Sequence, residues 1–144
     1  MLSPVMTVAE VDDFLEREFP QLNRNGRIYI LESIGPETAD MRFDAGEDDL
    51  RPGGTVSGPA MMALVDLAAY TVVLAHIGPV GLAVTTNLNI NFLRKPNPGR
   101  LKCRARLIKL GKRLAVIDAS VTSNGIDRLV AHATLTYSIP APSS

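Results

Sequence analysis

Asp66 is the residue of this sequence whose type and position most clearly suggest chemistry. It interrupts a stretch from Gly58 to Gly78 that otherwise consists largely of Ala, Met, Leu and Val. A buried carboxylate without a partner is energetically costly, so a lone aspartate in such a segment is either paired inside the protein or functional. A functional carboxylate can activate water as a general base or attack an electrophile directly as a nucleophile.

The tripeptide Ser57-Gly58-Pro59 predicts the start of the helix that carries Asp66. Ser or Gly can cap a helix, and Pro suits the first turn, where its missing N–H is not needed. Gly58 keeps its N–H at the positive end of the helix and has no side chain to hinder a ligand. A carbonyl that becomes an oxyanion in a transition state needs a preorganised donor of this kind. Gly58 and Asp66 are therefore candidate catalytic residues on one helix.

This helix is predicted to run from about Pro59 to His76 and to end at Gly78-Pro79. It is apolar around nearly its whole circumference, which indicates a helix surrounded by protein. We interpret it as a buried helix rather than a membrane span, because a charge at its middle is costly in lipid. No membrane partner is expected.

A second helix is expected within residues 1–20. Thr7 and Glu10 match a capping box, apolar residues follow at helical spacing, and Pro20 marks the end. Two short strands, 27–34 and 38–43, are predicted to follow, with a turn between them.

The second half of the chain alternates apolar and polar residues, which is typical of strands with one buried face. In its first strand two sets of residues alternate: Val84, Thr86, Leu88, Ile90 and Phe92 with Thr85, Asn87, Asn89 and Asn91. Three more strands are expected over about 101–107, 115–121 and 129–137. The turns predicted to join neighbouring strands into an antiparallel meander are Pro98-Gly99, Leu110-Gly111-Lys112 and Asn124-Gly125.

These elements predict an α+β fold. Two strands, a central buried helix and four long antiparallel strands pack best as a curved sheet wrapped around the helix, the hotdog arrangement. We expect a single domain over residues 1–144, with a frayed Pro/Ser tail at 140–144. Free strand edges and half-polar faces predict a homodimer, or a homotetramer built from dimers.

From about Asp44 to Tyr137 the sequence resembles the hotdog acyl-CoA thioesterases of the phenylacetate-degradation type. The resemblance rests on Gly54–Gly58 with Ala63–Asp66, on Thr86–Arg94 and on Lys109–Ala115. The family pattern is His-Gly-Gly at the helix start, followed by an acidic residue nine positions after the His. Here Ser57, Gly58 and Pro59 occupy the three places and Asp66 the acidic one, so the spacing is kept and the His is replaced.

The resemblance implies roles for further residues. Thr85 stands at a Ser/Thr position that contacts the attacking water or the substrate. Ser57 stands where the family His orients the site, and Arg51 where many members carry an Asn or Gln that positions the water. Five cations resemble positions that hold the phosphates and adenine end of coenzyme A: Arg94, Lys95, Lys109, Lys112 and Arg113. Each of them also fits a solvated surface charge.

The expected function is hydrolysis of an acyl-CoA thioester to a free acid and coenzyme A, at active sites on the subunit interface and without a further cofactor. The replacements at Ser57 and Arg51 leave open a catalytically weak acyl-CoA binding protein on the same fold. A hotdog dehydratase acting on enoyl-CoA is less favoured, because such enzymes resemble one another through a His that is missing here. The acyl group is not defined; residues that could line a tunnel, or serve as core, are Met61, Met62, Tyr70 and Val73.

Composition argues against several other classes. The formal net charge of zero gives no sign of a nucleic-acid partner. The single cysteine, Cys103, cannot form an internal disulfide, and with no signal-peptide pattern this favours the cytoplasm. His76 and His132 lack the neighbours that a metal needs. No Gly-rich phosphate loop and no Gly-x-Ser-x-Gly motif is present.

Overall fold

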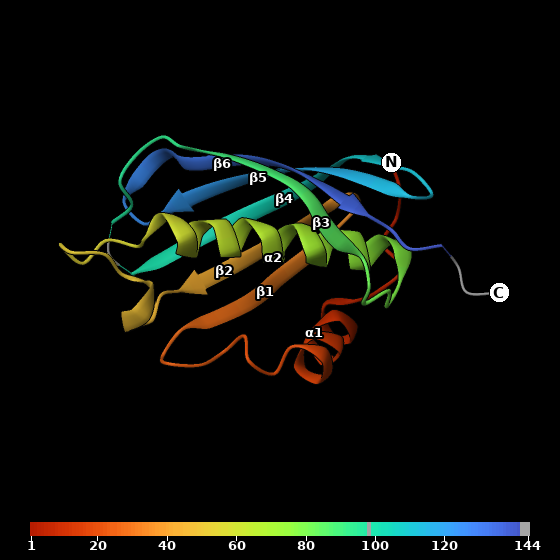
Figure 1. Ribbon diagram of the computed structural model, residues 1–144, viewed down its shortest axis with the longest axis horizontal. Helices are drawn as coiled ribbons and strands as arrows, with labels where there is room; N and C mark the ends of the chain where they lie inside the picture. The colour runs from red at the N-terminus through yellow and green to blue at the C-terminus, as the bar shows by residue number, and fades with distance from the viewer. Residues whose placement is uncertain (98, 142–144) are drawn as a thin grey trace.

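A curved antiparallel sheet wraps around one long helix in the computed structural model, which describes residues 1–97 and 99–141 (Figure 1). The strands are β1 (Ile28–Gly35), β2 (Thr38–Asp44), β3 (Val84–Phe92), β4 (Arg100–Leu110), β5 (Leu114–Ser123) and β6 (Ile126–Ser138). The helices are α1 (Val8–Glu18), the short 3-10 helix η1 (Glu47–Asp49) and α2 (Gly58–Ile77). This is the α+β hotdog fold predicted from the sequence.

The central helix α2 begins and ends where its sequence predicts. The Ser57 hydroxyl accepts a hydrogen bond from the Ala60 N–H at 3.2 Å, and Gly78 follows the last turn with a φ of 97°. By length and composition α2 could cross a membrane, but 72% of its most apolar window is buried inside the protein. It is therefore the core helix. One face stays exposed in the single chain, at Pro59, Met62 and Ala63.

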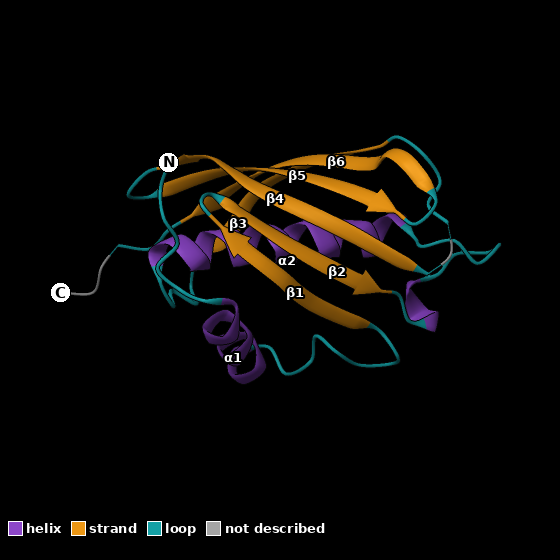
Figure 2. Cartoon of the chain, turned by 180° about the vertical axis from the view of Figure 1, so that it is seen from behind, coloured by secondary structure: helices purple, strands orange, loops and turns teal. Residues whose placement is uncertain are grey.

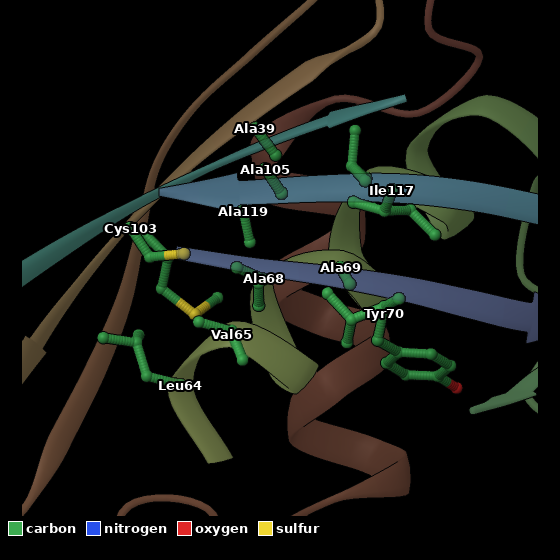
Figure 3. Packing of buried hydrophobic residues seen from close by; sticks show 14 of the residues in the cluster. Ala39, Leu64, Val65, Ala68, Ala69, Tyr70, Cys103, Ala105, Ile117 and Ala119 are labelled. Atoms are coloured by element: carbon green, nitrogen blue, oxygen red, sulfur yellow. The ribbon is translucent and has the colours of Figure 1, made fainter. Parts of the chain in front are cut away.

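Small side chains let the sheet approach α2 closely. Ala105 and Ala119 of the sheet and Ala68 and Ala69 of α2 gather in the core and are fully buried or nearly so (Figure 3). Cys103 lies in the same core, and burial raises the pKa of its thiol well above its ordinary value. Cys103 is thus an inert packing residue.

The amphipathic helix α1 lies beside β1 and below the C-terminal half of α2 (Figure 2). Its capping box is complete: the Thr7 hydroxyl accepts from the Glu10 N–H at 3.2 Å, and the Glu10 carboxylate accepts from the Thr7 N–H at 3.0 Å. Its buried residues are Val11, Phe14 and Leu15.

The expected meander is wrong at one connection. β3 pairs with β6, whereas β4 lies between β2 and β5, so the segment around Pro98-Gly99 joins strands that are not neighbours. The turns at 110–112 and 124–125 do join neighbouring strands. A turn motif fixes only local chain direction, and here α2 crosses the sheet so that β3 starts at its far edge. Pro98 and, in the predicted tail, residues 142–144 lie outside the described residues.

Candidate active site

The Asp66 carboxylate is held by two hydroxyl groups. Thr85 Oγ1 donates to Asp66 Oδ1 at 2.5 Å, and the Tyr137 hydroxyl donates to the same oxygen at 2.7 Å. The Tyr137 hydroxyl also lies 2.9 Å from the Asp66 carbonyl oxygen. Thr85 and Tyr137 are directly opposite each other in the β3–β6 ladder, so both reach α2 from one spot on the sheet.

A β-bulge in β3 turns Thr85 toward Asp66. Thr85 pairs with Tyr137 but Asn87 pairs with Thr136, which leaves one extra residue on β3. Strict alternation would place Thr85 on the face of Asn87, opposite to Leu88. The bulge instead puts Thr85 on the inner face with Leu88, and both are half-buried.

One carboxylate oxygen of Asp66 remains available. Among residues 1–97 and 99–141, Asp66 Oδ2 accepts no hydrogen bond, and Asp66 itself is half-buried. It lines a cavity of about 420 Å³, which we name the acyl cavity after the acyl group that the family resemblance implies for the substrate. The other walls of this cavity are largely apolar: Phe19, Leu22, Tyr29, Ala63, Leu67, Tyr70, Ala83, Val84, Thr85 and Tyr137. The carboxylate is thus fixed through one oxygen, and its other oxygen is free to act.

Tyr137 is a site residue for which the sequence pattern predicts only a place in the strand over about 129–137. Burial raises the pKa of its phenol far above the ordinary value, and the charge of Asp66 raises it further. The phenol therefore stays protonated and serves as a hydrogen-bond donor. A tyrosine at the inner end of a strand was the available signal, because a buried phenol needs a polar partner.

Gly58 supplies a free N–H at the start of α2. Pro59 has no N–H, the Ala60 N–H is capped by Ser57, and the Met61 N–H donates to the Ser57 carbonyl at 3.1 Å. Within the described parts of the chain the Gly58 N–H has no acceptor, as expected for the first turn of a helix. It lies in a second cavity of about 380 Å³, hereafter the Gly58 cavity.

The two predicted catalytic residues, Gly58 and Asp66, lie far from each other within one chain. Gly58 and Asp66 are eight residues apart on α2, and at 1.5 Å per residue this is about 12 Å. One carbonyl group cannot contact both. The structure therefore brings together Asp66 and Thr85, and it places Gly58 elsewhere.

The five predicted coenzyme A cations and Arg51 form two groups. Arg51, Arg94 and Lys95 line the Gly58 cavity, and Arg94 also donates to the Leu129 carbonyl oxygen at 2.7 Å. The other group lies at the β4–β5 turn, at the opposite end of the sheet (Figure 1), and consists of Lys109, Lys112 and Arg113. Within a single chain the five predicted cations therefore lie at opposite ends of the strands that carry them.

The structure also shows where the four residues that could line a tunnel lie. Tyr70 lines the acyl cavity and Met61 the Gly58 cavity, whereas Val73 is core and Met62 is exposed. No group of three or more His, Cys, Asp or Glu side chains suited to a metal occurs in the described residues.

A protein-family model described as the thioesterase superfamily matches residues 53–130, more than half of the chain. The chain belongs to the thioesterase superfamily. A "putative esterase" of Saccharolobus solfataricus is 32% identical over 119 residues, which cover 83% of this chain and 77% of that protein. Membership in this superfamily supports thioester hydrolysis as the general chemistry.

Solved structures of the thioesterase superfamily share the fold. A "putative thioesterase" of Silicibacter sp. TM1040 has a TM-score of 0.86 and 43% identity, covering 96% of this chain and 95% of that one. Zebrafish thioesterase superfamily member 2 has a TM-score of 0.80 at 19% identity, with 94% and 99% covered, which shows the fold alone.

Proposed function

We propose that this thioesterase-superfamily chain hydrolyses acyl-CoA thioesters. As a general base, Asp66 takes a proton from the water that adds to the thioester carbonyl; the C–S bond then breaks, and the coenzyme A thiolate takes up a proton. As a nucleophile, Asp66 attacks the carbonyl and expels coenzyme A, and water then hydrolyses the acyl-aspartate anhydride. The products of either route are a carboxylic acid and coenzyme A. The observation that carries this proposal is the Asp66 carboxylate, pinned through Oδ1 by Thr85 and Tyr137 with Oδ2 free beside an apolar cavity.

Two chains would form each site, because Gly58 and Asp66 are too far apart in one. If two α2 helices pack antiparallel about an axis near Met62, the Gly58 of each chain lies opposite the Asp66 of the other. Met62 lies on the exposed face of α2, and β3 is an edge strand that a second β3 could extend. We therefore expect a homodimer with two sites, alone or paired further into a homotetramer.

In this assembly the Gly58 N–H would polarise the thioester carbonyl at the positive end of α2. Arg51, Arg94 and Lys95, which line the Gly58 cavity, would bind the phosphates of coenzyme A. The cations of the β4–β5 turn would approach the site from the other chain, because antiparallel helices bring opposite ends of the two sheets together.

The test is release of free thiol from a panel of acyl-CoA esters, with wild type compared with Asp66→Asn. We expect turnover by wild type and a loss of about a hundredfold or more in the variant, the size typical of acid–base groups. Asp12→Asn, at an exposed position of α1, is the matched control. Turnover that Asp66→Asn leaves unchanged would exclude the mechanism.

A catalytically weak acyl-CoA binding protein is the second candidate. The observation in its favour is that Ser57, which stands at the place of the orienting His of the family pattern, uses its hydroxyl oxygen to cap α2. Calorimetry that detects binding of acyl-CoA esters, together with no thiol release, would favour this function.

A further inference from the structure

The acyl cavity beside Asp66 shares a wall with another cavity of about 530 Å³, hereafter the α1 cavity, which lies between α1, β1 and β2. The side chains that line both cavities are Phe19, Leu22, Tyr29 and Leu67. All four are half-buried. Three of them come from the segment that connects α1 to β1 and from the start of β1, so an element remote from Asp66 in sequence closes its cavity.

The wall is held in place by aromatic contacts and backbone hydrogen bonds. Phe19 packs edge-to-face on Tyr70, with ring centroids 5.6 Å apart and an interplanar angle of 85°. Tyr29 stacks on buried Phe43 at 4.6 Å. The Leu22 N–H donates to the Phe19 carbonyl oxygen at 3.2 Å. Aromatic pairs in these geometries are favourable beyond their buried area, so the wall is a fixed barrier rather than loose chain.

The α1 cavity behind the wall is apolar in its inner part and polar at its mouth. Buried Leu15, Leu31 and Met41 line its inner part. Asp12 and Glu16 line its outer rim and are exposed. An alkyl chain that passed the wall would therefore gain further apolar surface before it reached charged groups.

We propose that Phe19, Leu22, Tyr29 and Leu67 form a stop that limits the length of the acyl group. This inference rests on the proposed function and adds to it a preference for the length of the acyl group. An acyl group enters beside Asp66 and fills the acyl cavity, and the wall excludes chains that would extend into the α1 cavity. The preferred substrates are thus esters whose acyl group ends at the wall, and removing the wall joins the two cavities.

The test measures kcat/KM for a series of straight-chain esters from butanoyl-CoA to hexadecanoyl-CoA. For wild type we expect an optimum followed by a fall. For the double variant Phe19→Ala/Leu67→Ala we expect the ratio of dodecanoyl-CoA to butanoyl-CoA turnover to rise by about tenfold or more, since each added buried methylene is worth about fourfold. Leu67→Phe, which thickens the wall, should move the optimum to shorter chains.

Ile30→Ala is the matched control, because Ile30 lines the α1 cavity but not the shared wall. An unchanged length profile in both wall variants, or an equal change in Ile30→Ala, would overturn the stop. If wild type hydrolyses no ester of the series, the proposed function fails. The stop is then decided by calorimetric binding of the same esters, where an equal long-to-short ratio of Kd values in wild type and the double variant overturns it.

Discussion

Tyr137 and Asp66 are joined through one phenol that reaches two oxygens of the same residue, the carboxylate Oδ1 at 2.7 Å and the backbone carbonyl at 2.9 Å. The contact links the end of β6 to the middle of α2 and fixes both the side chain and the helix that carries it. In the proposed active site, this hydroxyl contact positions the reacting carboxylate, while the Tyr137 ring forms part of the wall of the acyl cavity.

Replacing Tyr137 by Phe should therefore lower kcat and leave KM within about threefold, because only the orientation of Asp66 changes. We expect a fall of roughly tenfold or more in kcat, in line with the value of one hydrogen bond to a charged group. Steady-state kinetics with a short acyl-CoA substrate checks this prediction. A rise in KM with kcat intact would show that the Tyr137 hydroxyl instead acts in substrate binding.

Thr85 offers a graded version of the same test. Thr85→Ser keeps the hydroxyl that donates to Asp66 and should retain most activity, whereas Thr85→Val keeps the shape and removes the donor. We expect Thr85→Val to lose about tenfold in kcat. Thr86→Val on the adjacent residue, which does not contact Asp66, is the control. Equal losses in the Ser and Val variants would argue against a donor role.

Mixing two inactive variants tests whether each site is shared between chains. Asp66→Asn removes the carboxylate and Gly58→Pro removes the N–H. In a mixed dimer one site then combines the intact Asp66 of one chain with the intact Gly58 of the other. Refolding the two variants together should recover about a quarter of wild-type activity if chains pair at random. No recovery, with mixed dimers detected by mass spectrometry, would contradict a shared site.

The three tyrosines make the free energy of unfolding depend on pH in the alkaline range. Burial is the main reason that the pKa values of Tyr29, Tyr70 and Tyr137 are raised above the ordinary 10.0. A raised folded-state pKa gives stability that is fully present below pH 10 and is lost as the pH rises through the folded values. The free energy of unfolding should therefore fall above pH 10. Tyrosinate absorbance in the native protein should appear at higher pH than in urea, and identical titrations would contradict this.

His76 holds the turn between β1 and β2. Its Nε2 accepts from the Glu37 N–H at 2.9 Å, and its Nδ1 lies 2.8 Å from the Val72 carbonyl oxygen, so the ring donates there as a neutral tautomer. His76→Leu leaves that N–H and that carbonyl without their ring partner and should cost about 1–3 kcal/mol in urea unfolding. Lys109→Ala, at an exposed position, should change stability by less than about 0.5 kcal/mol.

The sequence by itself determined the local structure and the candidate pair. Caps and glycines set both ends of α2, alternation predicted β3 to β6, and the spacing from Ser57 to Asp66 singled out the carboxylate. These features depend on residues close in the chain, whose propensities and hydrogen bonds act locally.

Only the tertiary structure decided which groups meet. The bulge in β3 turned Thr85 inward against the alternation of its strand, and the pairing of β3 with β6 placed Tyr137 beside it. The helical rise put Gly58 and Asp66 in separate cavities, and the α1–β1 segment closed the acyl cavity. Strand order, register shifts and cavity walls arise from packing between segments distant in sequence, so no local pattern encodes them.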